Sequence, residues 1–346
     1  MAKTKAGMAS GFLPSHWLLG GGHRQTLLGF WTRRRLRWTL PSEDLVVEAE
    51  EDVRLLARAT WQDGPRAERP ALVIVHGLGG SDASAYAVST GRHAFARGWH
   101  VVRMNMRGAG DGEALCQHLY NAGLDTDLLA VVAAVARVTP RVAVAGFSLG
   151  ASQALLALGR RRDHLPAALF GVAAVSPPLD LSACADALAR PDNRLYQHYF
   201  MTALREAYRR RARTWPDQFE EGRERATRTV REYDEAITAY YGGYASAADY
   251  YAKSSAGPWL ASIERPALIL AAADDPMIPQ ASVLRWPLPA SGIVRREVTP
   301  TGGHVGFVGR SAAPGLFWAA PRVLDFLEEV LAESGQDHPL ASGGRV

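Results

Sequence analysis

The sequence has few of the features that mark secreted, membrane-spanning or disulfide-rich proteins. Its 346 residues include only two cysteines, Cys116 and Cys184, too few for a disulfide framework, which favours a reducing compartment. No apolar run reaches the roughly 18 residues that a membrane-spanning helix needs. The basic residues from Met1 to Gly7 are not followed by the apolar run of a secretory signal. We therefore expect a cytoplasmic protein with no transmembrane segment.

Metal and nucleotide motifs are also absent. Potential metal ligands show no metal-site spacing, and neither H-E-x-x-H nor the phosphate-binding G-x-x-x-x-G-K-[ST] occurs, so we expect no metal and no cofactor. The formal net charge of +4 is too small to indicate nucleic-acid binding. The strongest basic cluster, Trp31 to Trp38, has the alternation of a strand with a solvated face. Contact with a membrane surface or a polyanion is the alternative for this cluster.

What the sequence does contain is a regular alternation of strand and helix patterns. A hairpin pattern covers residues 45–61. Strands are then expected at residues 72–75, 100–104, 142–145 and 168–175, and helices at 84–97, 126–138 and 151–161. This alternation predicts an α/β protein with a mostly parallel, doubly wound sheet covered by helices on both faces.

The alternation stops at Pro177 and Pro178, and a segment without strand patterns follows. Residues 179–263 are rich in tyrosine, arginine and glutamate, with helices expected at 195–213 and 219–241. Strands resume near residues 266 and 293, and a last amphipathic helix is expected at 317–333. The sequence thus predicts a core of residues 1–178 and 264–334, with a lead-in at 1–40. Residues 179–263 would form a helical cap insertion, and 335–346 a disordered tail.

The motif with the clearest chemistry is Gly146-Phe-Ser-Leu-Gly150. It follows an expected strand and precedes an expected helix, the context of a nucleophile elbow. The turn is so tight that the residues flanking the serine must be small. Ser148 is therefore the expected catalytic nucleophile, and a helix-capping serine is the alternative.

An acid and a histidine follow in the order that this elbow requires. Asp274 and Asp275 come directly after the strand expected near residue 266. Asp275 is favoured as the acid, because a branched apolar residue and a proline follow it closely, whereas Asp274 fits a turn residue. His304 lies in a glycine-rich loop after the next strand and is the expected base.

Two backbone amides are expected to form an oxyanion hole. The strand at 71–75 ends in His76-Gly-Leu-Gly-Gly80, and the loop after this strand donates one N–H in proteins with this elbow. The residue after the nucleophile donates the other. Leu78 and Leu149 are therefore the expected donors. His76 lies at the wrong place in the chain order for a base, and we expect it to brace the loop.

With these elements in order, the chain resembles the YheT-like family of α/β-hydrolases, from Phe12 to about Phe326. The resemblance implies the α/β-hydrolase fold with a cap insertion, a serine esterase or lipase activity, and a triad of Ser148, Asp275 and His304. The matching motifs are Phe12 to Pro14, His23 to Thr26, His76 to Ser81, Asn105 to Gly108, Tyr120 to Leu128, Gly146 to Gly150, Asp249 to Tyr251 with Ser254 and Ser255, Asp274 to Pro276, and Gly302 to His304.

The expected activity is hydrolysis of carboxylic esters through an acyl-enzyme. The expected partners are small acyl esters of short or medium chain length, or monoacylglycerol-like lipids, since the family and the apolar cap both favour an acyl chain. For the individual aromatic residues of the cap, packing of the cap onto the core is the favoured alternative to lining an acyl pocket. Acyl transfer to an alcohol is one alternative, because it uses the same acyl-enzyme. A non-catalytic binding protein on the same fold is the other.

Overall fold

A central eight-stranded sheet organises the computed structural model, which describes residues 12–14, 20–31, 36–310 and 317–336. The strand order is β2-β3-β5-β4-β6-β7-β8-β9, antiparallel across the first two pairs and parallel from β5 to β9. The expected mostly parallel α/β sheet is therefore confirmed. The strand bounds are β2 (Glu43–Glu50), β3 (Val53–Thr60), β4 (Ala71–Val75), β5 (His100–Met104), β6 (Val142–Phe147), β7 (Leu169–Val175), β8 (Ala267–Ala272) and β9 (Val294–Thr299).

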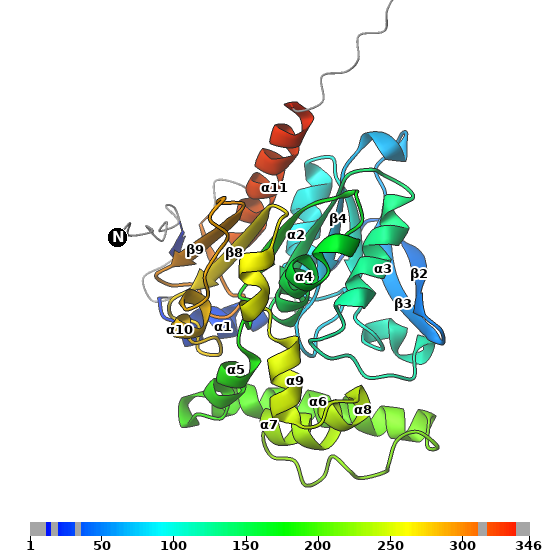
Figure 1. Ribbon diagram of the computed structural model, residues 1–346, viewed down its shortest axis with the longest axis vertical. Coiled ribbons are helices and arrows are strands. Elements are labelled where there is room, and N and C mark those ends of the chain that lie inside the picture. Colours follow the sequence, from blue (N-terminus) through cyan, green and yellow to red (C-terminus); the bar gives the residue numbers. More distant parts are fainter. Residues whose placement is uncertain (1–11, 15–19, 32–35, 311–316, 337–346) are drawn as a thin grey trace, which may run out of the picture.

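The central strands are apolar throughout because both faces of the sheet are buried. In β4, Leu72 and Ile74 belong to one apolar cluster, whereas Val73 and Val75 belong to the other. Helices cover both faces (Figure 1). The pair α2 (Ala85–Ala96) and α11 (Ala319–Gln336) packs on one face, and the pair α3 (Asp125–Ala136) and α4 (Leu149–Arg160) on the other.

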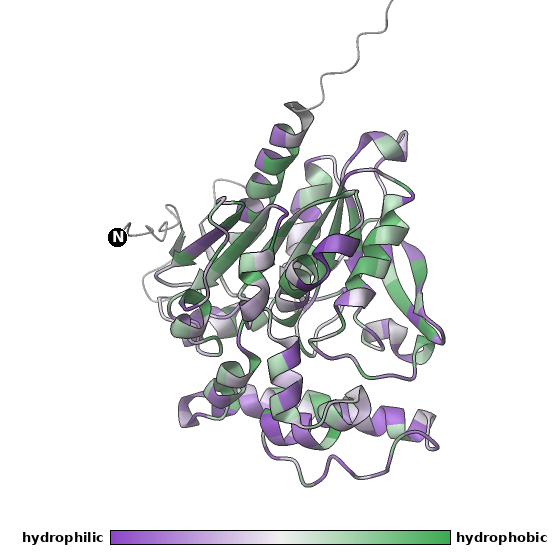
Figure 2. Ribbon diagram, viewed as in Figure 1, coloured by the Kyte–Doolittle hydropathy of each residue, from purple (hydrophilic) through white to green (hydrophobic). Residues whose placement is uncertain are grey.

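Between β7 and β8 the described chain forms helices and loops, without a strand. Figure 1 shows these helices together below the sheet, and Figure 2 shows them as more hydrophilic than the strands. We call this group the helical insertion. It consists of α5 (Leu181–Leu188), α6 (Arg194–Thr214), α7 (Val230–Tyr233), a π-helix (Asp234–Ala239), α8 (Tyr240–Gly242) and α9 (Ala247–Ser254).

The single long helix expected at 219–241 is wrong. Helix begins only at Val230, where the Thr229 side chain accepts a hydrogen bond from the Glu232 amide and caps the N-terminus. Gly222 has a φ of +83°, a left-handed conformation that a continuous helix cannot contain. Phe219 is buried against Tyr208 and packs there from a turn.

The lead-in also differs from its expected form. It contains a helix, α1 (Gly22–Trp31), and a short strand β1 (Leu13–Pro14), which pairs with β10 (Gly309–Arg310). Residues 36–38 of the basic cluster are not in a strand, and residues 32–35 lie outside the described residues. Of the tail expected at 335–346, the first two residues continue α11, and residues 337–346 lie outside the described residues. A short α10 (Gln280–Leu284) follows β8.

Candidate active site

Ser148 occupies the sharp turn between β6 and α4. Its φ of 51° and ψ of −118° lie outside the ordinary regions for a non-glycine residue. A Cβ on Gly146 would lie 2.5 Å from the Gly150 carbonyl oxygen, and a Cβ on Gly150 would lie 2.5 Å from the His76 carbonyl oxygen. Both flanking glycines are therefore required sterically, and the strained turn directs the serine side chain away from the sheet.

The structure brings the three expected triad side chains together. His304 Nε2 lies 2.9 Å from Ser148 Oγ, and His304 Nδ1 lies 2.9 Å from Asp275 Oδ2. The carboxylate accepts from Nδ1–H, so Nε2 is the acceptor of the serine hydroxyl proton. This geometry links a hydroxyl, an imidazole and a carboxylate in one hydrogen-bonded chain.

Asp275 is held firmly for contact with the imidazole. Its Oδ1 accepts from the backbone amides of Met277 at 2.9 Å and Ile278 at 3.0 Å, which leaves Oδ2 directed at His304. Asp274 has a different place: its Oδ1 accepts from the Gly303 amide at 2.9 Å, so it fastens the loop that carries His304. Burial raises the pKa of the Asp274 carboxyl.

The histidine loop rests on α1, which the sequence did not indicate. The His304 amide donates to Thr26 Oγ1 at 2.8 Å, and Thr26 Oγ1 donates to the Gly22 carbonyl at 2.7 Å. Gly303 has a φ of +60°, and a Cβ there would lie 2.4 Å from the Gly22 carbonyl oxygen. Thr26 is thus a functional residue that sequence reasoning missed. The only signal was its position within the family motif His23 to Thr26.

The loop after β4 carries the first expected oxyanion donor. The Gly79 amide donates to the Tyr120 hydroxyl at 2.9 Å, and a Cβ on Gly77 would lie 2.9 Å from Ser148 Cβ. The loop therefore passes directly against the serine. In the part of the chain that the structure describes, the Leu78 amide donates to no protein acceptor. Leu78 lines the cavity that contains Ser148.

The second expected donor, Leu149, is the first residue of α4. Amides in the first turn of a helix lack an intrahelical acceptor, and the helix dipole favours negative charge there. An oxyanion on the serine adduct would lie close to this amide, since Leu149 directly follows Ser148.

His76 braces the loop, as expected. It is fully buried, and its Nε2 accepts from the Met106 amide at 3.0 Å, so Nδ1 carries the proton and donates to the Gly77 carbonyl at 2.8 Å. A neutral imidazole with both nitrogens engaged has no free nitrogen for proton transfer.

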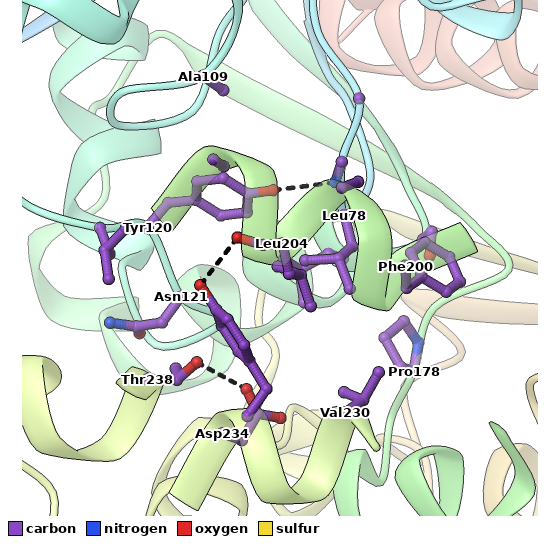
Figure 3. A pocket seen from close by; sticks show the side chains of 18 of the residues that line it. Leu78, Ala109, Tyr120, Asn121, Pro178, Phe200, Leu204, Val230, Asp234 and Thr238 are labelled. Carbon is purple, nitrogen blue, oxygen red and sulfur yellow. Dashed lines mark hydrogen bonds between the residues drawn. The ribbon is translucent and has the colours of Figure 1, made fainter. Parts of the chain in front are cut away.

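Two cavities meet at the serine. The first, of about 400 Å³, lies between the sheet and the helical insertion (Figure 3); the second, of about 310 Å³, lies between α1 and α6. Ser148, His304 and Leu78 line both cavities. The apolar lining of the first includes Leu181, Leu188, Phe200, Leu204 and Val230, and that of the second includes Leu27, Phe30, Trp31, Leu195 and Tyr199.

Within the described ranges, no group of three or more histidine, cysteine, aspartate or glutamate side chains is placed to hold a metal ion. Among the same residues, no helix combines the length and the apolar character needed to span a bilayer.

Comparison with known proteins gives one consistent result. The family model described as alpha/beta hydrolase fold matches residues 70–310. The Escherichia coli (strain K12) protein named "Putative esterase YheT" is 32% identical over 89% of this chain and 91% of its own length. The mouse protein named Phospholipase ABHD3 is 28% identical over 69% of this chain and 59% of its own length.

Among solved structures, the Pyrococcus furiosus esterase Pf2001 is similar, with a TM-score of 0.52 and 16% identity. The similarity covers 84% of this chain and 96% of that one. At this identity the likeness supports the fold alone. The matched family model and the YheT relative decide the assignment: the chain belongs to the YheT-like family of α/β-hydrolases, a family of the serine esterase and lipase type.

Proposed function

We propose that this protein hydrolyses carboxylic esters through an acyl-enzyme on Ser148. His304 Nε2 takes the hydroxyl proton as Ser148 Oγ attacks the acyl carbonyl, and later donates that proton to the leaving alcohol. Asp275 keeps the imidazole in the required tautomer and stabilises the imidazolium. The observation that supports this most directly is the pair of 2.9 Å contacts on either side of the His304 ring.

The amides of Leu78 and Leu149 would bind the oxyanion of the tetrahedral intermediate. Their positions on the loop beside Ser148 and at the N-terminus of α4 support this role. Each such donor contributes about 3 kcal/mol of transition-state stabilisation in serine hydrolases.

The two cavities support an ester with apolar groups on both sides of the scissile bond. Residues 179–263 would act as a cap, and the first cavity beneath it would bind a short or medium acyl chain. The alcohol, including the glycerol of a monoacylglycerol-like lipid, would lie in the second cavity. The leaving oxygen must reach the proton on His304. Val305, beside His304 in sequence, and Thr26, which holds the His304 loop, both line the second cavity and not the first, so this cavity is favoured for the alcohol.

A panel of p-nitrophenyl esters of rising acyl length, run with wild type and Ser148→Ala, tests the proposal. The alanine variant should lose activity by a factor on the order of 10⁶ while its melting temperature stays unchanged, because the hydroxyl contributes little to packing. A fluorophosphonate probe should label wild type at Ser148, and labelling that persists in the variant would contradict the assignment. Repeating the assay with glycerol present separates hydrolysis from acyl transfer, since transfer yields a new ester.

A further inference from the structure

A carboxyl group lines the first cavity on the side of the helical insertion. Asp234 begins the six-residue π-helix between α7 and α8, and Figure 3 shows it beside Thr238 at the cavity wall. π-Helices are rare and are frequently found at functional sites. Asp234 is partly exposed as a residue and lines the first cavity, although its carboxyl group is enclosed by protein.

The hydrogen bonds of Asp234 leave acceptor capacity unused. Its Oδ1 accepts from the Thr238 hydroxyl at 2.7 Å, and its Oδ2 accepts from the Tyr251 hydroxyl at 2.7 Å. A carboxylate can accept about four hydrogen bonds. No ion pair of Asp234 is found in the described part of the chain. Arg231, one turn earlier, pairs instead with Asp186 at 2.6 Å.

The protein around Asp234 disfavours the ionised form of its carboxyl group. Burial raises the pKa of Asp234 to about 6, although hydrogen bonds from Thr238 and Tyr251 and the charge of the nearby Arg231 favour the ionised form. Burial also raises the pKa of the tyrosines around it, Tyr233, Tyr250 and Tyr251, so these hydroxyls stay neutral. At neutral pH the group is therefore mostly ionised, and its direct hydrogen-bond partners are uncharged. A buried charge in this situation is stabilised by a donor that enters the cavity.

A structural role accounts for only part of this arrangement. The contact between Asp234 and Tyr251 joins the π-helix to α9, but a neutral amide could accept the same hydrogen bond. A purely structural contact would require neither the negative charge nor the position of Asp234 at the cavity wall.

We infer that Asp234 forms a binding subsite for a hydrogen-bond donor, a hydroxyl or an ammonium group, carried by the substrate arm that lies beneath the helical insertion. The inference rests on the proposed function for its choice of ligands, namely esters whose acyl arm enters the first cavity. The first cavity would then select acyl chains that carry a donor group at one defined distance from the ester carbonyl.

Binding to Ser148→Ala tests the subsite without turnover. Calorimetry compares methyl esters of alkanoic acids with their ω-hydroxy and ω-ammonio counterparts over a series of chain lengths. Affinity for the substituted esters should exceed that for the alkyl ester by roughly tenfold to a hundredfold, the range of one hydrogen bond to a charged group. The preference should appear only at lengths that bring the donor to Asp234. Equal affinities at every length would overturn the inference.

Adding Asp234→Asn to the Ser148→Ala variant should abolish the preference for ammonium and reduce that for hydroxyl, because the amide keeps an acceptor oxygen but not the charge. Asp217→Asn, the same change at an exposed position of the insertion that lines neither cavity, is the matched control and should retain both preferences. If the Asp217 control lost the preference equally, the subsite assignment would be wrong.

The pH dependence of ligand affinity in Ser148→Ala is a second readout, and it can be measured even if Asp234→Asn fails to fold. Because the pKa of Asp234 is raised to about 6, the preference for ammonium should be present above that pH and be lost below it. Aliphatic ammonium groups stay charged over this range. The ratio of affinities for ammonium and hydroxyl ligands isolates the charge. Where Asp234→Asn folds, the same pH series on that variant measures the contribution of the other ionisable groups. These are Glu113, Glu206, Arg210, Arg211 and His304, which line the cavity, and Arg231, whose charge acts on Asp234.

The outcome separates the inference from the proposed function. A preference for donors in Ser148→Ala supports the subsite whether or not wild type cleaves esters. Ester cleavage by wild type together with equal affinities in Ser148→Ala would support the proposed function and overturn the subsite.

Discussion

The backbone amide of His304 donates a hydrogen bond to Thr26 Oγ1 at 2.8 Å, although 278 residues separate the two in sequence. Thr26 in turn donates to the Gly22 carbonyl one turn earlier in α1. The loop that carries the proposed base is therefore held by a helix from the other end of the chain. The lead-in segment contributes to the active site through this contact.

This contact predicts that Thr26→Val lowers kcat by about tenfold, since it leaves the His304 amide without its acceptor at a cost of about 1–3 kcal/mol and loosens the loop. Thr26→Ser keeps the hydroxyl and should retain most of kcat. Steady-state kinetics with a p-nitrophenyl ester measure both. A valine variant with wild-type kcat would show that the loop needs no support from α1.

The sequence was most informative where function depends on local backbone geometry. Gly146 and Gly150 predicted the turn at Ser148, because any Cβ at either position would collide with backbone atoms. The placement of Thr26 and Asp234 could not be predicted in this way. Thr26 acts through a contact with a distant loop, and Asp234 depends on how the insertion packs over the core, and neither relationship leaves a periodic pattern along the chain.

The two neighbouring aspartates should respond differently to the same substitution. Asp275→Asn should lower kcat by roughly 10⁴-fold, because an amide in place of Oδ2 favours the wrong imidazole tautomer. Asp274→Asn should cost far less, since its amide oxygen can still accept from the Gly303 N–H. Parallel measurements of kcat for the two variants check this. A larger loss in Asp274→Asn would transfer the role of the acid to that residue.

Arg211 joins the helical insertion to the core. The residue is 2% exposed, and its guanidinium donates to the backbone carbonyls of Gly108, Cys116 and Gln117. Arg211→Lys should reduce the free energy of unfolding by about 2–4 kcal/mol. The lysine ammonium lacks the planar array of donors with which the guanidinium reaches all three carbonyls, so buried carbonyls would be left without a donor. Urea titration measures the loss. The neighbouring Arg213→Lys, at an exposed position of α6, is the control and should change stability little. Equal stability of wild type and Arg211→Lys would show that the carbonyls find other donors.

The two cavities should control the two halves of the ester separately. In wild type, kcat/KM should rise by roughly fourfold for each added acyl methylene, from about 0.8 kcal/mol of burial. It should then fall once the chain exceeds the cavity of about 400 Å³. Leu204→Trp fills part of this first cavity and should move the optimum to shorter acyl chains. Its effect on a series of alcohols with a fixed acyl group should be small.

Leu195→Trp provides the reciprocal test, because Leu195 lines only the second cavity, between α1 and α6. The added ring should alter the dependence on alcohol length and leave the acyl optimum in place. Both series use kcat/KM for esters that differ only in one arm, so effects on the triad cancel within each variant. If Leu204→Trp moved the alcohol optimum and Leu195→Trp the acyl optimum, the acyl chain would have to lie between α1 and α6. If both variants changed both series equally, the two arms would share one cavity.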